Sequence, residues 1–175
     1  MRKVFLLLVM SVLCLCSKAQ YTDGGKNFWS VDLGVGGNGE TSLNLGVGYH
    51  HSFAPIVAWD VLTFQAISHP GALKEHTFLQ ALSGLRLTSP TFALSGMDNM
   101  SIFAIGRAGY GWWTDPQVGG FTFEVGGGVN LTSHLYIGYA FNHEDAGSVS
   151  SGKGANKVTV NREMKYHSFR LGFYF

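Results

Sequence analysis

Two short segments of the chain have residue types and spacings that could do chemistry. Gly34, Gly36 and Gly39 match the spacing of a dinucleotide-binding loop. That loop needs a helix N-terminus after its glycines, whereas the residues that follow alternate as in a strand. His50 and His51 are adjacent, so they face opposite sides of any strand and cannot easily bind one metal together. We therefore predict no metal site, no cofactor and no catalytic residue in either segment.

Six charged residues lie well inside segments with a period of two. They all have the opposite parity from the bulky apolar residues, and the same face carries many glycines. These six residues are Asp32, Asp60, Arg86, Arg107, Glu124 and Arg170. A period of two is typical of β-strands, whose successive side chains point to opposite faces. The charges are therefore predicted to share one side of a sheet.

Eight such segments position these charges. They cover residues 27–37, 40–50, 55–66, 76–88, 100–113, 119–131, 134–143 and 164–175. All four prolines fall in connections or at the first residue of a segment, as the need of a β-ladder for N–H donors requires. Residues 147–157 are a low-complexity stretch rich in Gly and Ser, which predicts a flexible loop.

The N-terminus has the pattern of a secretory signal peptide over residues 1–19. Basic Arg2 and Lys3 precede an apolar run, and small residues lead to a predicted cleavage site after Ala19. Both cysteines, Cys14 and Cys16, lie in this segment, so no disulfide is expected in the domain formed by residues 20–175. With 12 Lys and Arg against 11 Asp and Glu and no basic cluster, no nucleic-acid partner is expected.

An exported chain of eight alternating strands can form two kinds of barrel. A soluble, lipocalin-like barrel would place its bulky face inside, whereas a membrane barrel places that face outside, against lipid. Glycine is a poor strand residue on a water-exposed face, but it fits beside arginines and tyrosines inside a narrow barrel. The pattern favours an all-β fold: an eight-stranded antiparallel up-and-down transmembrane β-barrel.

This pattern resembles the small outer-membrane β-barrel family of the OmpA/OmpX type over essentially the whole domain. The resemblance implies the outer membrane of a Gram-negative bacterium, contact with its lipid and lipopolysaccharide, and termini in the periplasm. It also implies a structural or interaction role without catalysis, although it names no extracellular partner. The terminal strand resembles the signal read by the barrel-assembly machinery; its outward residues are Phe169, Leu171, Phe173 and Phe175.

Two alternatives remain open at this stage. The first is a small pore, although an eight-stranded barrel is only wide enough for side chains to fill. The second is a lipid A deacylase-like enzyme centred on His143, whose surroundings loosely resemble the motif of those small barrels. The family's serine two residues after the histidine is replaced here by Asp145, which removes the nucleophile.

The strand order of such a barrel also predicts three ion pairs in the lumen. Neighbouring strands would bring together Asp60 with Arg86, Glu124 with Arg107, and Asp32 with Arg170. These pairs would form a ladder through the interior.

Overall fold

The computed structural model describes residues 26–37, 41–68, 77–94, 96–114, 118–151 and 158–175. The strands are β1 (Asn27–Gly37), β2 (Thr41–Ala54), β3 (Val57–Ser68), β4 (Thr77–Thr88), β5 (Phe92–Leu94), β6 (Met97–Trp113), β7 (Val118–Asn130), β8 (Leu135–Ser151) and β9 (Val158–Tyr174). In these residues there is no helix of sufficient length and apolarity to cross a bilayer. The predicted signal peptide lies outside the described residues.

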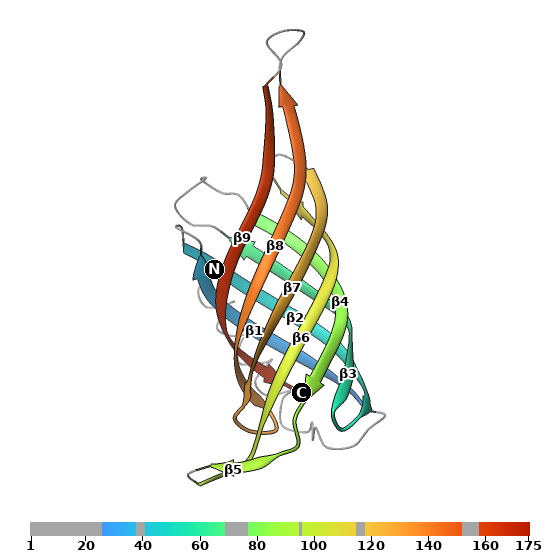
Figure 1. The fold of residues 1–175 in the computed structure, drawn as a ribbon, viewed down its shortest axis with the longest axis vertical. Coiled ribbons are helices and arrows are strands. Elements are labelled where there is room, and N and C mark those ends of the chain that lie inside the picture. The colour runs from blue at the N-terminus through green and yellow to red at the C-terminus, as the bar shows by residue number, and fades with distance from the viewer. Residues whose placement is uncertain (1–25, 38–40, 69–76, 95, 115–117, 152–157) are drawn as a thin grey trace, which may run out of the picture.

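Eight of the strands form a closed antiparallel barrel. The hydrogen-bonded order is β4-β3-β2-β1-β9-β8-β7-β6, and β6 pairs with β4 to complete the circle (Figure 1). The first and last strands are neighbours, with Ser30 opposite Tyr174 and Gly37 opposite His167. The predicted fold, an eight-stranded antiparallel up-and-down barrel, is confirmed.

The alternation of side chains is regular along most strands, with one break in β3. Asp60 faces inward, and so do Thr63 and Gln65, because the register with β4 shifts between Asp60 and Thr63. This bulge lets Leu62 and Phe64 point outward although a strict period of two would put them in the lumen. Leu62 and Phe64 therefore face outward like Trp59, whereas Ala58 and Ile67, near the two ends of β3, face the lumen.

Two segments differ from the sequence prediction. Residues 147–151, which were expected to be part of a flexible loop, continue β8, so the loop prediction is wrong there; residues 152–157 lie outside the described part of the chain. The β8–β9 pair consequently projects beyond one end of the barrel as a two-stranded ribbon (Figure 1). At the other end, the connection between β4 and β6 contains the additional short strand β5, where the sequence analysis placed no strand.

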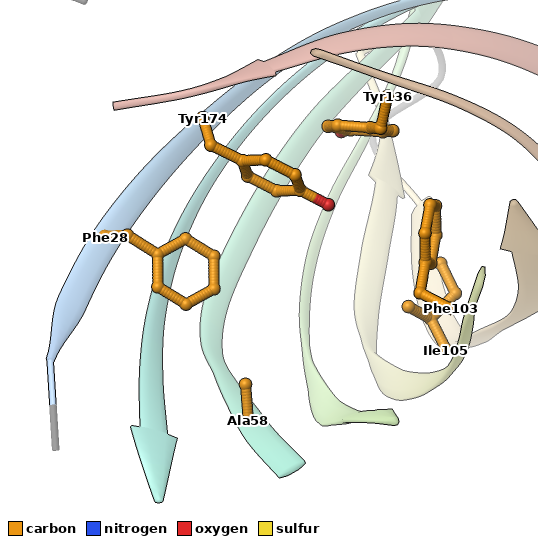
Figure 2. Close-up of a cluster of buried hydrophobic side chains, with 6 residues drawn as sticks. All are labelled: Phe28, Ala58, Phe103, Ile105, Tyr136 and Tyr174. Carbon is orange, nitrogen blue, oxygen red and sulfur yellow. The ribbon is translucent and has the colours of Figure 1, made fainter. Parts of the chain in front are cut away.

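Two apolar clusters fill the lumen at opposite ends. At the end with the C-terminus the cluster consists of Phe28, Ala58, Phe103, Ile105, Tyr136 and Tyr174, and Figure 2 shows these side chains pointing into the lumen. Near the ribbon end the cluster consists of Ile67, Phe78, Trp113 and Tyr166. The charged residues lie between them, so the barrel has a polar middle layer enclosed by two apolar layers.

The apolar cluster at the end of the lumen with the C-terminus requires glycine at one inward-facing position, Gly172. A Cβ atom at Gly172 would lie 2.1 Å from a ring atom of Tyr136, and that ring is held by Tyr174, stacked at 4.7 Å, and by Phe103, edge-on at 5.5 Å. Since the ring cannot move aside, Gly172→Val is expected to lower the free energy of unfolding by about 1–3 kcal/mol. Urea unfolding in phosphatidylcholine vesicles, followed by tryptophan fluorescence, measures this change.

The matched control is Gly106→Ala, because a Cβ atom there would have nothing within 4 Å. Its free energy of unfolding should stay close to that of the unmodified protein. Equal losses in both variants would show that strand propensity, rather than the packing of Tyr136, requires glycine at Gly172.

Candidate functional site

The carboxylate of Asp60 is the centre of the polar layer. Arg107 donates from Nε to Asp60 Oδ2 at 2.5 Å, and Arg86 donates from Nε to Oδ1 at 3.5 Å. His50 lies on the neighbouring strand, with its Nδ1 2.6 Å from Oδ1. All four side chains are almost fully excluded from solvent. Two guanidinium groups and a ring nitrogen thus surround one buried carboxylate.

A second carboxylate, Glu124 on β7, continues this network across the lumen. Its Oε1 accepts from Arg107 Nη1 at 2.9 Å, and its Oε2 accepts from Arg170 Nη2 at 2.5 Å. Gln65 also donates to Oε2, at 3.0 Å. Asp60, Arg107, Glu124 and Arg170 therefore form one continuous chain of alternating charge, and each carboxylate is bonded by charged donors, the strong form of hydrogen bond.

Aromatic rings hold the third arginine. The guanidinium carbon of Arg86 lies 4.7 Å from the ring centroid of Phe103, 5.4 Å from that of Tyr174 and 5.8 Å from that of Tyr136. Its Nη1 also donates to the hydroxyl of Tyr174. Cation–π contacts in a desolvated setting are favourable. Arg86 therefore joins the charged layer to the apolar cluster below it.

The three expected ion pairs have different outcomes. Asp60 lies within 4 Å of Arg86, and Glu124 within 4 Å of Arg107, as expected. The pair of Asp32 with Arg170 is wrong. The Asp32 carboxylate lies against Gly46 of β2 and accepts from the Tyr136 hydroxyl at 3.2 Å, whereas Arg170 on β9 reaches across to Glu124. The strand order identifies which strands are neighbours in the barrel wall. In a narrow lumen, however, a long side chain such as that of Arg170 can also contact residues on strands that are not its neighbours.

Two buried residues of this layer were missed at the level of sequence. His50 shares the inward parity of Asn44 and Gly48, so the parity of β2 could have placed it in the lumen. Glu144 is buried beside Tyr166 on the inward face of β8, one residue past the predicted end of that strand. With Glu144 included, the buried ionisable side chains of Asp, Glu and Arg in the described part of the lumen are four carboxyl and three guanidinium groups.

Ser30, His50 and Asp60 have the hydrogen-bond order of a hydrolase triad. Ser30 Oγ is 2.7 Å from His50 Nε2, and His50 Nδ1 is 2.6 Å from Asp60. A substrate would need space beside Ser30, but Phe28 stacks on the His50 ring at 4.7 Å and a Cβ atom at Gly48 would meet both side chains within 2.7 Å. Within the described residues, this triad works as a structural bridge between strands.

The enzymatic alternative at His143 finds no catalytic partner in the described part of the chain. The ring of His143 faces outward, stacks on Phe123 at 5.0 Å and lies with Nδ1 3.6 Å from Glu163 Oε1. Lys165 Nζ is 2.7 Å from the same oxygen, and this hydrogen bond and charge lower the pKa of the Glu163 carboxyl. Among the side chains that the structure describes, those around His143 provide an acid and an amine, and no serine hydroxyl is bonded to the ring.

The described residues contain no cluster of three His, Cys, Asp or Glu side chains that could hold a metal. Gly34 and Gly36 lie in β1, which is followed by another strand, so the dinucleotide-loop geometry is absent from these residues. A small space within the polar layer, bordered by Asp32, Arg86 and Tyr136, measures about 10 Å³, which is about the space of one water.

The outer face of the barrel is apolar. Leucines, valines, isoleucines and aromatic residues on every barrel strand are exposed; among them are Leu33, Leu45, Phe64, Leu85, Ile102, Val125, Ile137 and Phe169. A shallow groove of about 660 Å³ runs over this face between Leu33 on β1 and Ile137 on β8, with Phe169 on its border. At the C-terminal end of this face Trp29 packs on Tyr49, and toward the ribbon end Trp112 packs on Phe64.

The four residues of the predicted assembly signal lie on β9 and just after it. Phe169 and Leu171 are exposed on the outer face, and Phe173 and Phe175 are half-buried. The backbone of Phe175 pairs with Trp29 in both directions, at 2.7 and 3.0 Å. The last residue therefore belongs to the seam between the first and last strands.

Solved structures similar in shape to this chain include the two that follow. A de novo designed transmembrane β-barrel has a TM-score of 0.49 and 12% sequence identity, covering 90% of this chain and 100% of its own. Ail, the attachment invasion locus protein of Yersinia pestis, has a TM-score of 0.46 and 11% identity, covering 87% of this chain and 99% of its own. No family model and no curated protein matches the sequence.

Proposed function

We propose that the chain is an integral outer-membrane β-barrel protein of a Gram-negative bacterium, similar to the OmpA/OmpX type, with a structural or interaction role. The main support for this proposal is the distribution of side chains, which is the reverse of that in a water-soluble protein. Charged and amide side chains fill the interior, and exposed apolar side chains cover the outside. Such a surface is unfavourable in water but suits the hydrocarbon layer of a bilayer, where a closed barrel satisfies every backbone group.

The filled lumen favours this role over a pore. Two apolar clusters and a bonded charge network occupy the interior, and the space beside Asp32 and Arg86 in this network is about that of one water. Purified protein in planar lipid bilayers should give no steady conductance, while cell fractionation should find it folded in the outer membrane. Stable channels, or recovery in a soluble fraction, would contradict the proposal.

The ribbon supports the interaction part of the role. Beyond Glu144, β8 pairs only with β9 among the described residues, and β9 pairs only with β8 before His167. Neither edge of the ribbon therefore has a further strand beside it among the described residues, and such sheet edges can bind lipopolysaccharide or an outside partner. A cysteine at Thr159 should react with an impermeant maleimide on whole cells. A cysteine at Thr132, in a turn at the other end of the barrel, should react only after the membrane is permeabilised. The reverse result would mean that the barrel has the opposite orientation in the membrane.

Deleting Phe175 is expected to lower the yield of folded protein. This deletion removes two backbone hydrogen bonds with Trp29 at the seam of the barrel, and we propose that it also weakens recognition by the barrel-assembly machinery. The fraction that migrates as a folded band before boiling, but not after, reports the change in outer membranes. An unchanged folded fraction would remove Phe175 from the assembly signal.

A further inference from the structure

The connection between β4 and β6 is a short apolar hairpin. Its base is closed by Ser89, whose backbone N donates to the oxygen of Ile102 at 2.8 Å and whose Oγ accepts from the nitrogen of Ile102 at 2.9 Å. Beyond this base, β5 pairs with the first residues of β6, and Gly96 makes the turn with φ at +86°. The segment is thus an ordered two-stranded element attached to the barrel.

The hairpin exposes apolar side chains without burying any beneath itself. Phe92, Ala93 and Leu94 are consecutive and all exposed, Leu94 at 55%, and Met97 across the turn is 42% exposed. Residues 89 to 97 contain no charged residue, and Asp98 is the single charged residue between residues 89 and 99. An isolated hairpin is only marginally stable in water, and clustered exposed apolar residues indicate a surface that binds something.

The position of the hairpin identifies what it binds. Leu87 and Ile102, on the strands that lead into the hairpin, are 56% and 55% exposed on the outer face of the barrel, so the apolar side chains of the hairpin begin a few residues beyond the edge of that face. In Figure 1, β5 runs across the long axis at the lower end rather than extending it. An apolar element directed sideways at the edge of a lipid-facing belt fits the boundary between headgroups and acyl chains.

We infer that the hairpin of residues 89–99 inserts Phe92, Leu94 and Met97 into the interfacial region of the periplasmic leaflet. This inference rests on the proposed location of the barrel in a membrane. In this position at the side of the barrel, the hairpin would fix the depth of the barrel in the bilayer. The competing explanation is that the hairpin binds a protein partner in the periplasm. In that case these side chains would be in water when only lipid is present.

Single cysteines labelled with the dye NBD can test the inference, in protein that lacks the segment with Cys14 and Cys16. The test site is Leu94→Cys, repeated at Met97; Val125→Cys on the lipid-facing side and Thr132→Cys in a polar turn are the references. Each variant is folded into phosphatidylcholine vesicles, and folding is verified by heat-modifiable migration. Dye emission is then measured with brominated lipids and, separately, with iodide on both sides of the membrane.

The expected result is a blue-shifted emission at Leu94 that brominated lipid quenches as at Val125, together with weaker iodide quenching than at Thr132. If Leu94 and Met97 behave like Thr132 while Val125 is quenched by lipid, the barrel is inserted but the hairpin is in water, and the inference is wrong. If Val125 itself escapes quenching by lipid, the proposed membrane location fails, and the inference fails with it.

Discussion

Replacing Asp60 by Asn is expected to lower the free energy of unfolding by about 3–5 kcal/mol, since it leaves buried charges without their partner. The carboxylate contacts Arg107, Arg86 and His50, and none of these side chains can reach water. An amide of the same shape keeps the packing but cannot neutralise two guanidinium groups. Urea unfolding of the protein in vesicles, with folded and unfolded bands quantified on gels, measures the loss.

The matched control removes a carboxylate charge in the same way from an exposed ion pair. Glu163→Gln breaks the contact with Lys165 on the ribbon, where both side chains are about half exposed, so the free energy of unfolding should hardly change. If Asp60→Asn were as mild as this control, water would have to enter the lumen and solvate the two arginines. The description of a tightly bonded plug would then be wrong.

A second large effect is expected on the outer face. Val125→Arg places a guanidinium on a side chain position that is 55% exposed among other apolar residues, at the middle of β7. In a bilayer this charge would lie near the midplane, and the expected cost is about 2–4 kcal/mol of folding free energy. Unfolding in vesicles measures this value, and the folded fraction in outer membranes shows the effect in cells.

Two controls separate lipid contact from local packing. Val125→Leu changes the volume without adding charge, and Ser68→Arg adds the same charge at an exposed position at the end of β3. Both should leave the free energy of unfolding nearly unchanged. A loss in Val125→Arg that persists in detergent-free buffer but disappears in lipid would contradict a membrane location for this face.

The barrel itself could be predicted because each strand carries its own local signal. A period of two, strand ends marked by glycine and proline, and six charges on one parity are all properties of neighbouring residues. The ribbon and hairpin were missed for a related reason. Residues 147–151 are small and polar, so no alternation marks them, and their strand form depends on pairing with β9. In the hairpin, Pro90 and Gly96 gave the signals of a turn.

The charge network was harder to predict because its contacts cross the lumen. Arg170 could have been assigned to Asp32 or to Glu124, and only the direction of its long side chain decides between them. The bulge in β3 likewise depends on register with β4, which no local pattern in β3 contains. The alternation of side chains along each strand shows which residues face the lumen. The ion-pair partner of each charged residue depends on the shape of the closed barrel.

The neighbourhood of the first and last strands has a consequence for the time course of folding. Pairing of Gly34 with Arg170 joins residues from almost opposite ends of the sequence. The Arg170 guanidinium, which forms the second ion pair of Glu124, thus lies on the last strand. Until β9 is in place, Glu124 has only Arg107 to balance it. Closing the seam and neutralising the interior are therefore one event. A chain interrupted before β9 should be arrested as an open, charged sheet instead of maturing into a smaller barrel.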